Sequence, residues 1–294
     1  MSIGADTLAA LSAAGLDAEA IQMQIANAII EDLGGGLDVT SFATIEDSAQ
    51  ARGFIATRAY GVIAGAHVAA AVFELLGVST QVLREDGSVV EPGDKVVAVV
   101  GPTRAMLTAE RTALNFISHL SGIATQTSKW VAALEGSKAR ILDTRKTTPG
   151  LRALEKFAVR CGGGVNHRMG LSDMALIKDN HIVAAGSVTA AFDAVRKQFP
   201  DLRIEVECDT FVQVKEAVEA GATMVLLDNM TPEELRECVS WVDGRATCEA
   251  SGGLSLETAR AVAASGVDFL SNGGLTNSAP ILDLGLDLVS GGTS

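Results

Sequence analysis

The stretch IEVECDTFVQVKEAVEAGATMVLLDN, residues 204–229, holds two short apolar runs with a helical pattern between them. The runs at 204–206 and 224–227 have the length and composition of buried strands. Between them, residues 211–220 place apolar side chains at helical spacing. A strand, a helix and a second strand over so short a stretch predict a parallel βαβ unit.

The same alternation recurs over most of the second half of the chain. Further strand-like runs occupy 141–142, 175–177, 247–250 and 267–270, and further helical stretches occupy 188–198, 232–239 and 256–264. Six or so such units favour a parallel barrel over an open sheet. No dinucleotide-binding G-x-G-x-x-G and no Walker A pattern occurs, which argues against an NAD-binding enzyme or an ATPase.

The first part of the chain has a different pattern. Ile21, Ile25 and Ile29 recur at helical spacing and predict an amphipathic helix over 17–33. Beyond it, the pattern predicts a loop at 34–41, a strand at 51–59 and a helix at 66–76. Strands follow over 80–101, with turns at Asp86-Gly87 and Pro92-Gly93. A long helix is predicted at 109–134, although Gly122 is unfavourable for its continuity. Strands with a few covering helices favour an α+β first domain.

Composition excludes several classes of protein. Apolar residues make up 48% and charged residues 20% of the 294 positions, as in a globular protein of one large or two medium domains. The net charge of −13 argues against nucleic acid or an acidic membrane as a partner. No apolar run is long enough for a membrane helix, the N-terminus lacks a basic signal region, and the cysteines form no C-x-x-C pair, so a cytoplasmic enzyme is expected.

Positive charge is concentrated in one window, residues 140–181, which holds eight Lys and Arg against four acids. A positive island in an acidic protein attracts small anions locally. Surface ion pairing is the alternative explanation for some of these residues. Inside the window, GGGVNHRMG (162–170) presents His167 and Arg168 after three glycines, which let the backbone pass close to a ligand or a neighbouring strand.

Nearly every predicted strand of the second half ends in polar residues. In a barrel, these positions face the mouth of the active site, which is therefore expected here. The residues concerned are Asp143, Arg145, Lys146, Lys178, His181, Glu207, Asp228, Asn229, Glu249, Ser251, Gly252, Gly253, Ser271, Asn272, Gly273 and Gly274.

The last two strand ends predict a phosphate cradle. Ser251-Gly252-Gly253 precedes a helix for which Ser255 is a candidate N-cap, so main-chain N–H groups are exposed at a helix start. Ser271-Asn272-Gly273-Gly274 is its companion loop, and the last loops of barrels are frequent phosphate sites.

The middle strand ends are anionic. Glu207 and Asp228 are candidates to hold Mg²⁺ through water, or to stabilise positive charge that develops on a reacting carbon. Pairing of these acids with Lys178 or Arg145 is the structural alternative.

Long segments of the chain resemble the quinolinate phosphoribosyltransferase family, the decarboxylating nicotinate-nucleotide pyrophosphorylases. The central match is DTRKTTPGLRALEKFAVRCGGGVNHRMGLSDMALIKDNH (143–181). Shorter matches are EDLGGGLDVTS (31–41), ERTALNFISHLSGIAT (110–125), EVE (205–207), LLDN (226–229), EASGGL (249–254) and GVDFLSNGGLTNSA (266–279).

The resemblance implies an α/β fold in two parts. The first is an N-terminal open-faced α/β sandwich over residues 1–114, with a C-terminal tail at about 281–294. The second is an incomplete parallel α/β barrel, TIM-like and of the type II phosphoribosyltransferase kind, over 115–280. The resemblance also implies a homodimer in which the N-terminal region of one subunit closes the barrel mouth of the other and contributes Arg111.

The implied reaction converts quinolinate and 5-phosphoribosyl-1-pyrophosphate into nicotinate mononucleotide, pyrophosphate and CO₂, in de novo NAD synthesis. Mg²⁺ accompanies the phosphoribosyl donor, and no organic cofactor is needed because the pyridine ring is its own electron sink. By resemblance, the dicarboxylate is surrounded by Arg145, Lys146, His167, Arg168, Lys178 and the partner's Arg111. The implied catalytic residues are Lys146, Lys178, Glu207 and Asp228.

One loop departs from the family pattern. The family sequence is closer to VGALTHS, whereas this chain has NGGLTNS, with Asn272 in place of an apolar residue. Asn277 stands where a phosphate-contacting histidine is common, so weaker phosphate binding is expected. Three alternatives remain at this point: a paralogous pyrophosphorylase for another heterocyclic acid, a Schiff-base aldolase using Lys178, and a non-catalytic anion sensor.

Overall fold

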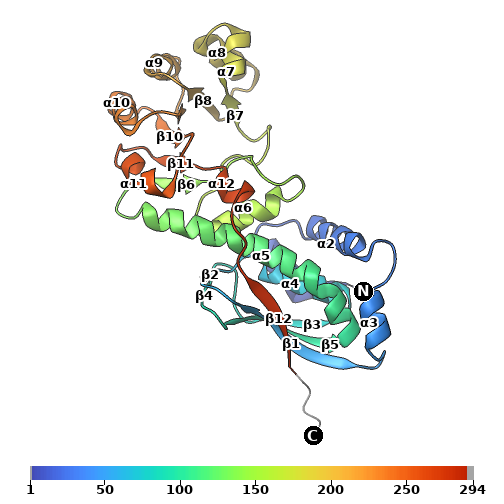
Figure 1. The fold of residues 1–294 in the computed structure, drawn as a ribbon. Helices are drawn as coiled ribbons and strands as arrows, with labels where there is room; N and C mark the ends of the chain where they lie inside the picture. The colour runs from blue at the N-terminus through green and yellow to red at the C-terminus, as the bar shows by residue number, and fades with distance from the viewer. Residues whose placement is uncertain (1, 290–294) are drawn as a thin grey trace. The chain divides into compact units, whose positions relative to one another are not determined.

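The computed structural model describes residues 2–289, so positions 290–294 of the predicted C-terminal tail lie outside the described residues. The chain divides into two compact units (Figure 1). The first comprises Met1–Gln126, Ala153–Gly163 and Ala279–Ser294, and the second comprises Thr127–Arg152 and Gly164–Ser278. Within the described range, no helix is both long and apolar enough to cross a membrane.

A four-stranded antiparallel sheet organises the first unit, in the order β12-β1-β5-β3. Ile55 lies opposite both Val97 and Leu286, so the C-terminal strand completes a sheet begun early in the chain. The strands are Gln50–Thr57 (β1), Ser79–Val82 (β3), Lys95–Pro102 (β5) and Leu284–Val289 (β12), and a separate ribbon pairs Gly61–Val62 (β2) with Val89–Val90 (β4).

Helices pack on this sheet and on one another. Ala66–Leu75 (α4) contacts β3 and β5, and its residues 68–73 are completely buried. Ala5–Ala13 (α1) and Ala18–Leu33 (α2) in turn contact α4. A sheet with packed helices is the sandwich that was expected for the first domain.

Two N-caps explain where the early helices begin. The prediction of a helix over 17–33 is confirmed, since Asp17 caps α2 and accepts hydrogen bonds from the main-chain N–H groups of Glu19 and Ala20. The prediction of a loop over 34–41 is wrong at its end, because Val39–Thr44 forms a short helix (α3). Asp38 caps this helix by accepting from the N–H of Ser41 at 3.0 Å.

The long helix α5 (Thr103–Ala133) begins six residues before its predicted start and runs without a break through Gly122. A Cβ on Gly122 would lie 2.2 Å from the main-chain oxygen of Pro280. The glycine therefore permits the main chain at Pro280 to approach the helix closely, and it does not mark a break in the helix.

A helix at Arg152–Cys161 (α6) was not predicted, because it falls inside the cationic window. Its apolar side, which includes Leu154 and Phe157, is buried. Lys156 is also completely buried, and Arg160 donates to the main-chain oxygen of Ala14 at 2.6 Å. These two bases of the window are thus held within the first unit.

The second unit is built on six parallel strands, which confirms the predicted alternation of strands and helices. The sheet order is β6-β11-β10-β9-β8-β7. The strands are Arg140–Leu142 (β6), Ala175–Ile177 (β7), Ile204–Cys208 (β8), Met224–Asp228 (β9), Thr247–Ser251 (β10) and Phe269–Ser271 (β11). The helices are Asp179–Ala185 (α7), Val188–Gln198 (α8), Phe211–Glu219 (α9), Pro232–Val242 (α10), Leu256–Ala263 (α11) and Gly274–Asn277 (α12).

The barrel is incomplete, as expected. Its two edge strands, β6 and β7, are consecutive in sequence and do not pair with each other. Beside β6, the segment after the three glycines takes the place of a strand. The N–H of Val165 donates to the oxygen of Ile141 at 2.9 Å, and the N–H of Asp143 donates to the oxygen of Val165 at 3.2 Å. This pairing carries His167 and Arg168 to the strand ends.

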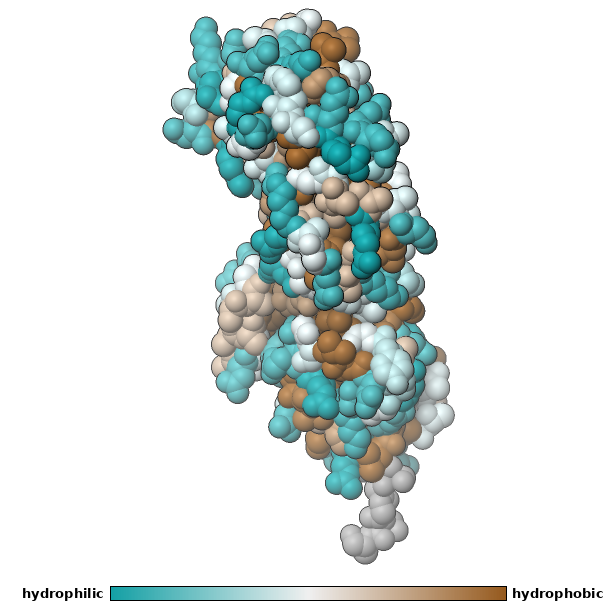
Figure 2. Space-filling view, turned by 90° about the vertical axis from the view of Figure 1, so that its left-hand side faces the viewer, coloured by the Kyte–Doolittle hydropathy of each residue, from teal (hydrophilic) through white to brown (hydrophobic). Residues whose placement is uncertain are grey.

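The helices around the parallel sheet keep their polar sides outward. In the view of Figure 2, the part of the surface where α7 to α10 lie is mostly hydrophilic, with isolated apolar patches. Val188, Ala191 and Phe192 of α8 show the opposite, buried side of such a helix. This amphipathic division fits a parallel sheet covered by helices.

Candidate active site

A pocket of about 380 Å³ lies at the carboxyl ends of the parallel strands. Ten of the residues predicted to lie at the site line it: Arg145, Lys146, His167, Arg168, Lys178, Glu207, Asp228, Glu249, Ser251 and Ser271. Thr144, Leu176 and Leu226 complete the lining. The predicted loop residues Gly252, Gly253, Asn272, Gly273, Gly274 and Asn277 are not part of the lining, and Arg111 lies on α5, in the first unit.

Two guanidinium groups create a strongly positive part of the pocket. Arg168 donates through Nη1 to the main-chain oxygen of Met174 at 3.0 Å, which holds its side chain in place. Burial and the neighbouring charge of Arg145 lower the pKa of Arg168 below its ordinary value. The buried Nε of Arg145 has no hydrogen-bond partner among the described residues. Two close cations with an unused donor are suited to an anion that accepts several hydrogen bonds.

Lys178 and Glu207 form an ion pair across the pocket, between the ends of β7 and β8. The structural alternative raised by the sequence, pairing of Glu207 with Lys178, is therefore present. A Schiff-base lysine needs few neighbouring anions, so the contact with Glu207 argues against the aldolase alternative.

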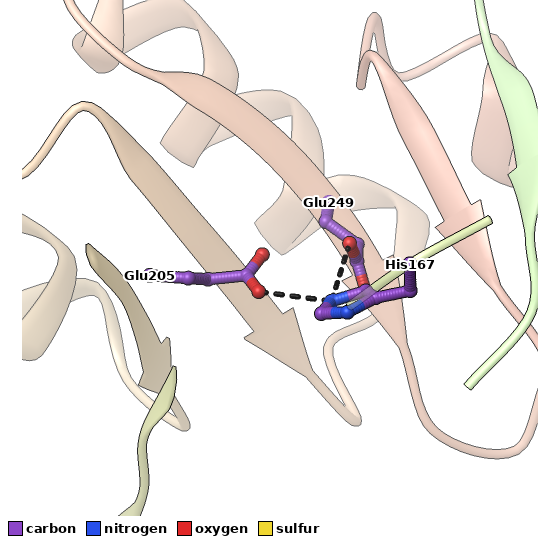
Figure 3. A group of neighbouring side chains, drawn as sticks. All are labelled: His167, Glu205 and Glu249. Carbon is purple, nitrogen blue, oxygen red and sulfur yellow. Dashed lines mark hydrogen bonds and ion pairs between the residues drawn. The ribbon is translucent and has the colours of Figure 1, made fainter. Parts of the chain in front are cut away.

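His167 is held on all sides by the protein. Its main-chain N–H donates to Asp143 Oδ1 at 2.9 Å, and its Nδ1 accepts from the N–H of Arg168 at 2.7 Å. Its Nε2 lies 2.9 Å from Glu205 and 3.5 Å from Glu249 (Figure 3). Since Nδ1 is an acceptor, the ring proton is on Nε2, and the imidazole is neutral in this arrangement.

The two glutamates under His167 are almost inaccessible to solvent, with exposed fractions of 0% and 1% for Glu205 and Glu249. Burial, and secondly the charge of Glu205, raise the pKa of Glu249 well above its ordinary value, which favours its protonated form. By ligand type, His167, Glu205 and Glu249 are able to hold a metal ion, and their ligand atoms lie within 4.8 Å of one another. The proton on Nε2 argues against that use, so Glu205 is better described as a hydrogen-bonded support for His167, with Glu249 buried beside it.

Glu205 was missed by the reasoning from sequence. Glu205 and Glu207 are two residues apart on β8, so both side chains point to the same face of the sheet. That spacing in an otherwise apolar strand was a usable signal for a second carboxylate beneath the pocket.

The loop after β10 has the backbone conformation that glycine allows. Gly252 and Gly253 have φ angles of +86° and +58°. A Cβ on Gly252 would lie 2.1 Å from Oδ1 of Asn229. Ser255 caps α11 and accepts from the N–H of Thr258 at 3.3 Å, which confirms the predicted N-cap.

The loop after β11 packs against Lys146. A Cβ on Gly273 would lie 2.6 Å from Cδ of Lys146, and Thr276 donates to the main-chain oxygen of Lys146 at 2.8 Å. Asn272 uses its side-chain oxygen within the loop, accepting from the N–H of Gly274 at 2.7 Å. Asn277 likewise accepts a hydrogen bond from the hydroxyl of its neighbour Ser278. Both asparagine oxygens therefore support the loop itself.

An incomplete parallel barrel with paired arginines, lysines and two carboxylates at its strand ends defines a class of barrel enzyme that acts on small anionic substrates. Two family models match the chain: Quinolinate phosphoribosyl transferase, N-terminal domain, over residues 38–121, and Quinolinate phosphoribosyl transferase, C-terminal domain, over residues 123–287. The chain belongs to the quinolinate phosphoribosyl transferase family.

Individual relatives agree with this assignment. The chain is 49% identical over 277 residues to a Mycobacterium leprae protein named nicotinate-nucleotide pyrophosphorylase [carboxylating], with 92% of this chain and 98% of the relative covered. It is 42% identical to a Bacillus subtilis protein with the same name, given as probable, covering 88% and 90%. The crystal structure of NadC from Streptococcus pyogenes superposes with a TM-score of 0.89 at 38% identity, covering 93% of this chain and 98% of that one.

Proposed function

We propose that this protein is a quinolinate phosphoribosyltransferase, a pentosyltransferase of de novo NAD synthesis. It converts quinolinate and 5-phosphoribosyl-1-pyrophosphate into nicotinate mononucleotide, pyrophosphate and CO₂. The observation that carries the proposal is that Arg145 and Arg168 line one pocket and interact electrostatically, with Lys146 and Lys178 also in its wall. The names of the relatives at 42% and 49% identity support it.

Quinolinate has two adjacent carboxylates, and a site for it needs several fixed donors. Arg145 and Arg168 bind one or both carboxylates through their planar guanidinium groups. Lys146 and Lys178 add charge, with Lys178 shared between the substrate and Glu207. Each charge-assisted hydrogen bond contributes roughly 1.5–3 kcal/mol. Leu176 and Leu226 give the flat pyridine ring an apolar surface within the same pocket.

The pyridine nitrogen then attacks the anomeric carbon of the ribose as pyrophosphate departs. Positive charge develops on that carbon, and the carboxylates of Glu207 and Asp228 stabilise it electrostatically. The loops after β10 and β11 receive the phosphate groups of the donor. Once the ring nitrogen is quaternised, its positive charge stabilises the electron pair that stays on the adjacent carbon as CO₂ leaves, and that carbon then takes up a proton from water.

The donor set fits indirect binding of Mg²⁺. Glu207 is paired with Lys178, and Asp228 accepts a hydrogen bond through Oδ2 from Asn229, so each has already used an oxygen within the protein. Their remaining oxygens suit water molecules around an ion carried in with the donor. When bound, Mg²⁺ neutralises charge on the leaving pyrophosphate.

We also propose a homodimer with shared active sites. Arg111 is exposed on α5, and it would reach the substrate of the partner subunit. Mixing two inactive variants, Arg111→Ala and Lys178→Ala, should restore part of the activity, because one mixed site would then contain both residues. An absence of recovery in confirmed mixed dimers would contradict the shared site.

The reaction itself is tested by measuring CO₂ release from quinolinate with and without the phosphoribosyl donor. Donor-dependent release is the expected result. A preference for nicotinate, without CO₂, would instead identify a paralogous pyrophosphorylase. A cytoplasmic location stays a prediction that rests on the four unpaired cysteines, and two plant relatives are named as chloroplastic proteins.

A further inference from the structure

Asn229, directly after β9, has an unusual backbone conformation. Its φ angle is +55°, and the only other non-glycine residue with positive φ in the described part of the chain is Asp243. Left-handed backbone is uncommon outside glycine, and asparagine is one of the few residues that tolerate it.

Three contacts define what Asn229 does, two through its side chain and one through its main chain. Its Nδ2 donates to Oδ2 of Asp228 at 2.6 Å. Its main-chain N–H donates to the oxygen of Ser251 at 2.9 Å, which ties the end of β9 to the end of β10. Its Oδ1 occupies the space beside Gly252, where a Cβ would lie only 2.1 Å away. One residue thus touches both the middle carboxylate of the pocket and the glycine loop.

We propose that Asn229 is a positioning residue that holds the Asp228 carboxylate and the Ser251-Gly252-Gly253 loop in one fixed arrangement. This inference rests on the proposed function, in which Asp228 acts on the ribose carbon and the loop receives phosphate of the same donor molecule. The ribose carbon and the phosphate are covalently joined parts of one ligand, so the spacing of their two protein partners must match the reach of that ligand. Asn229 supplies that spacing by contacting both.

The charge arrangement explains why asparagine stands here and aspartate does not. A carboxylate at this position would lose the Nδ2 donor and place a second negative charge against Asp228. Glycine would keep the left-handed backbone but would leave Asp228 and Gly252 without their common contact. Asn229→Asp and Asn229→Gly therefore remove the side-chain amide while both residues still tolerate the left-handed backbone, so the effect of the amide is measured separately from that of the backbone conformation.

Steady-state kinetics of these two variants test the proposal. We expect kcat/KM for the phosphoribosyl donor to fall about tenfold or more in both, since a hydrogen bond to a charged group is lost. The KM for quinolinate should stay within about twofold of wild type. Asp243→Gly is the matched control, because Asp243 shares the positive φ but follows α10, on the opposite end of the strands. It should leave both constants unchanged.

A double-mutant cycle with Asp228→Asn tests whether Asn229 acts through Asp228. The expected result is that Asn229→Gly reduces activity much less in the Asp228→Asn background than in wild type. Additive effects would overturn the proposal, as would full activity of Asn229→Gly while Asp228→Asn is impaired. If Asp228→Asn is itself fully active, then the role proposed for Asp228 fails, and with it the inference on Asn229. Donor-dependent CO₂ release by the wild type tests the overall reaction separately from all of these outcomes.

Discussion

Nδ1 of His167 accepts a hydrogen bond of 2.7 Å from the main-chain N–H of Arg168. The imidazole therefore presents its proton through Nε2 toward Glu205, and both ring nitrogens are occupied by the protein. The resemblance led us to expect His167 among the groups that bind the dicarboxylate. The geometry instead favours a neutral ring that fixes the main chain at Arg168, so the fixed positive charge comes from the arginines and lysines.

The buried carboxyl of Glu249 predicts a specific dependence of stability on pH. Its pKa in the fold is raised above the ordinary value of 4.5. The folded state therefore holds a proton that the unfolded chain releases, and stability falls as the pH rises from the unfolded pKa through the folded one. Glu249→Gln, which mimics the protonated form, should remove this loss. Denaturant unfolding at several pH values measures it.

The control for that experiment is an acid on the surface of another helix. Glu219 is exposed on α9, so Glu219→Gln should leave the pH dependence of the wild type intact. Equal slopes of stability against pH in the wild type and in Glu249→Gln would show that Glu249 is ionised in the fold.

Arg168→Lys tests the two-arginine subsite. A lysine keeps the charge but loses the planar pair of donors, so the KM for quinolinate should rise about 10- to 100-fold. Arg160→Lys is the matched control, because Arg160 belongs to the same cationic window but donates to Ala14 within the first unit. An unchanged KM in Arg168→Lys, or a comparable increase in Arg160→Lys, would contradict the subsite.

Gly122→Ala tests the close approach in the first unit. Alanine is the better helix former by about 1 kcal/mol, so propensity alone predicts stabilisation. The new Cβ would instead lie 2.2 Å from the oxygen of Pro280, and we expect a loss of about 1–3 kcal/mol in the free energy of unfolding. Gly36→Ala, whose Cβ would meet its nearest atom at 3.6 Å, should be close to neutral. A stabilised Gly122→Ala protein would refute the close contact.

Asn277→His tests the departure of the last loop from the family pattern. Histidine adds a donor able to carry charge near the phosphate side of the site, so the KM for the phosphoribosyl donor should fall while turnover stays similar. Ser278→Ala, which removes only the hydroxyl that donates to Asn277, separates the loss of that hydrogen bond from the gain of the imidazole. An increased KM in Asn277→His would refute the prediction.

Much of the second unit could be predicted because its information is local. The apolar runs and the helical spacing between them became β8, α9 and β9, and Ser255 caps α11 as its sequence indicates. The failures were also local in origin. The loop prediction overlooked Asp38 as an N-cap. The helix α6 was missed because its basic residues were assigned to the cationic window, although its apolar side chains have helical spacing.

The amino-acid sequence by itself determined the strand and helix pattern, the positive window and the family of this protein, because spacing and side-chain chemistry act over neighbouring residues. Only the tertiary structure decided which of the window's charges meet. Arg145 and Arg168 lie together in the pocket, whereas Lys156 and Arg160 belong to the first unit. That choice depends on the pairing of Val165 beside β6, at the edge of the parallel sheet. No local pattern encodes such pairing, since it follows from the packing of the whole sheet.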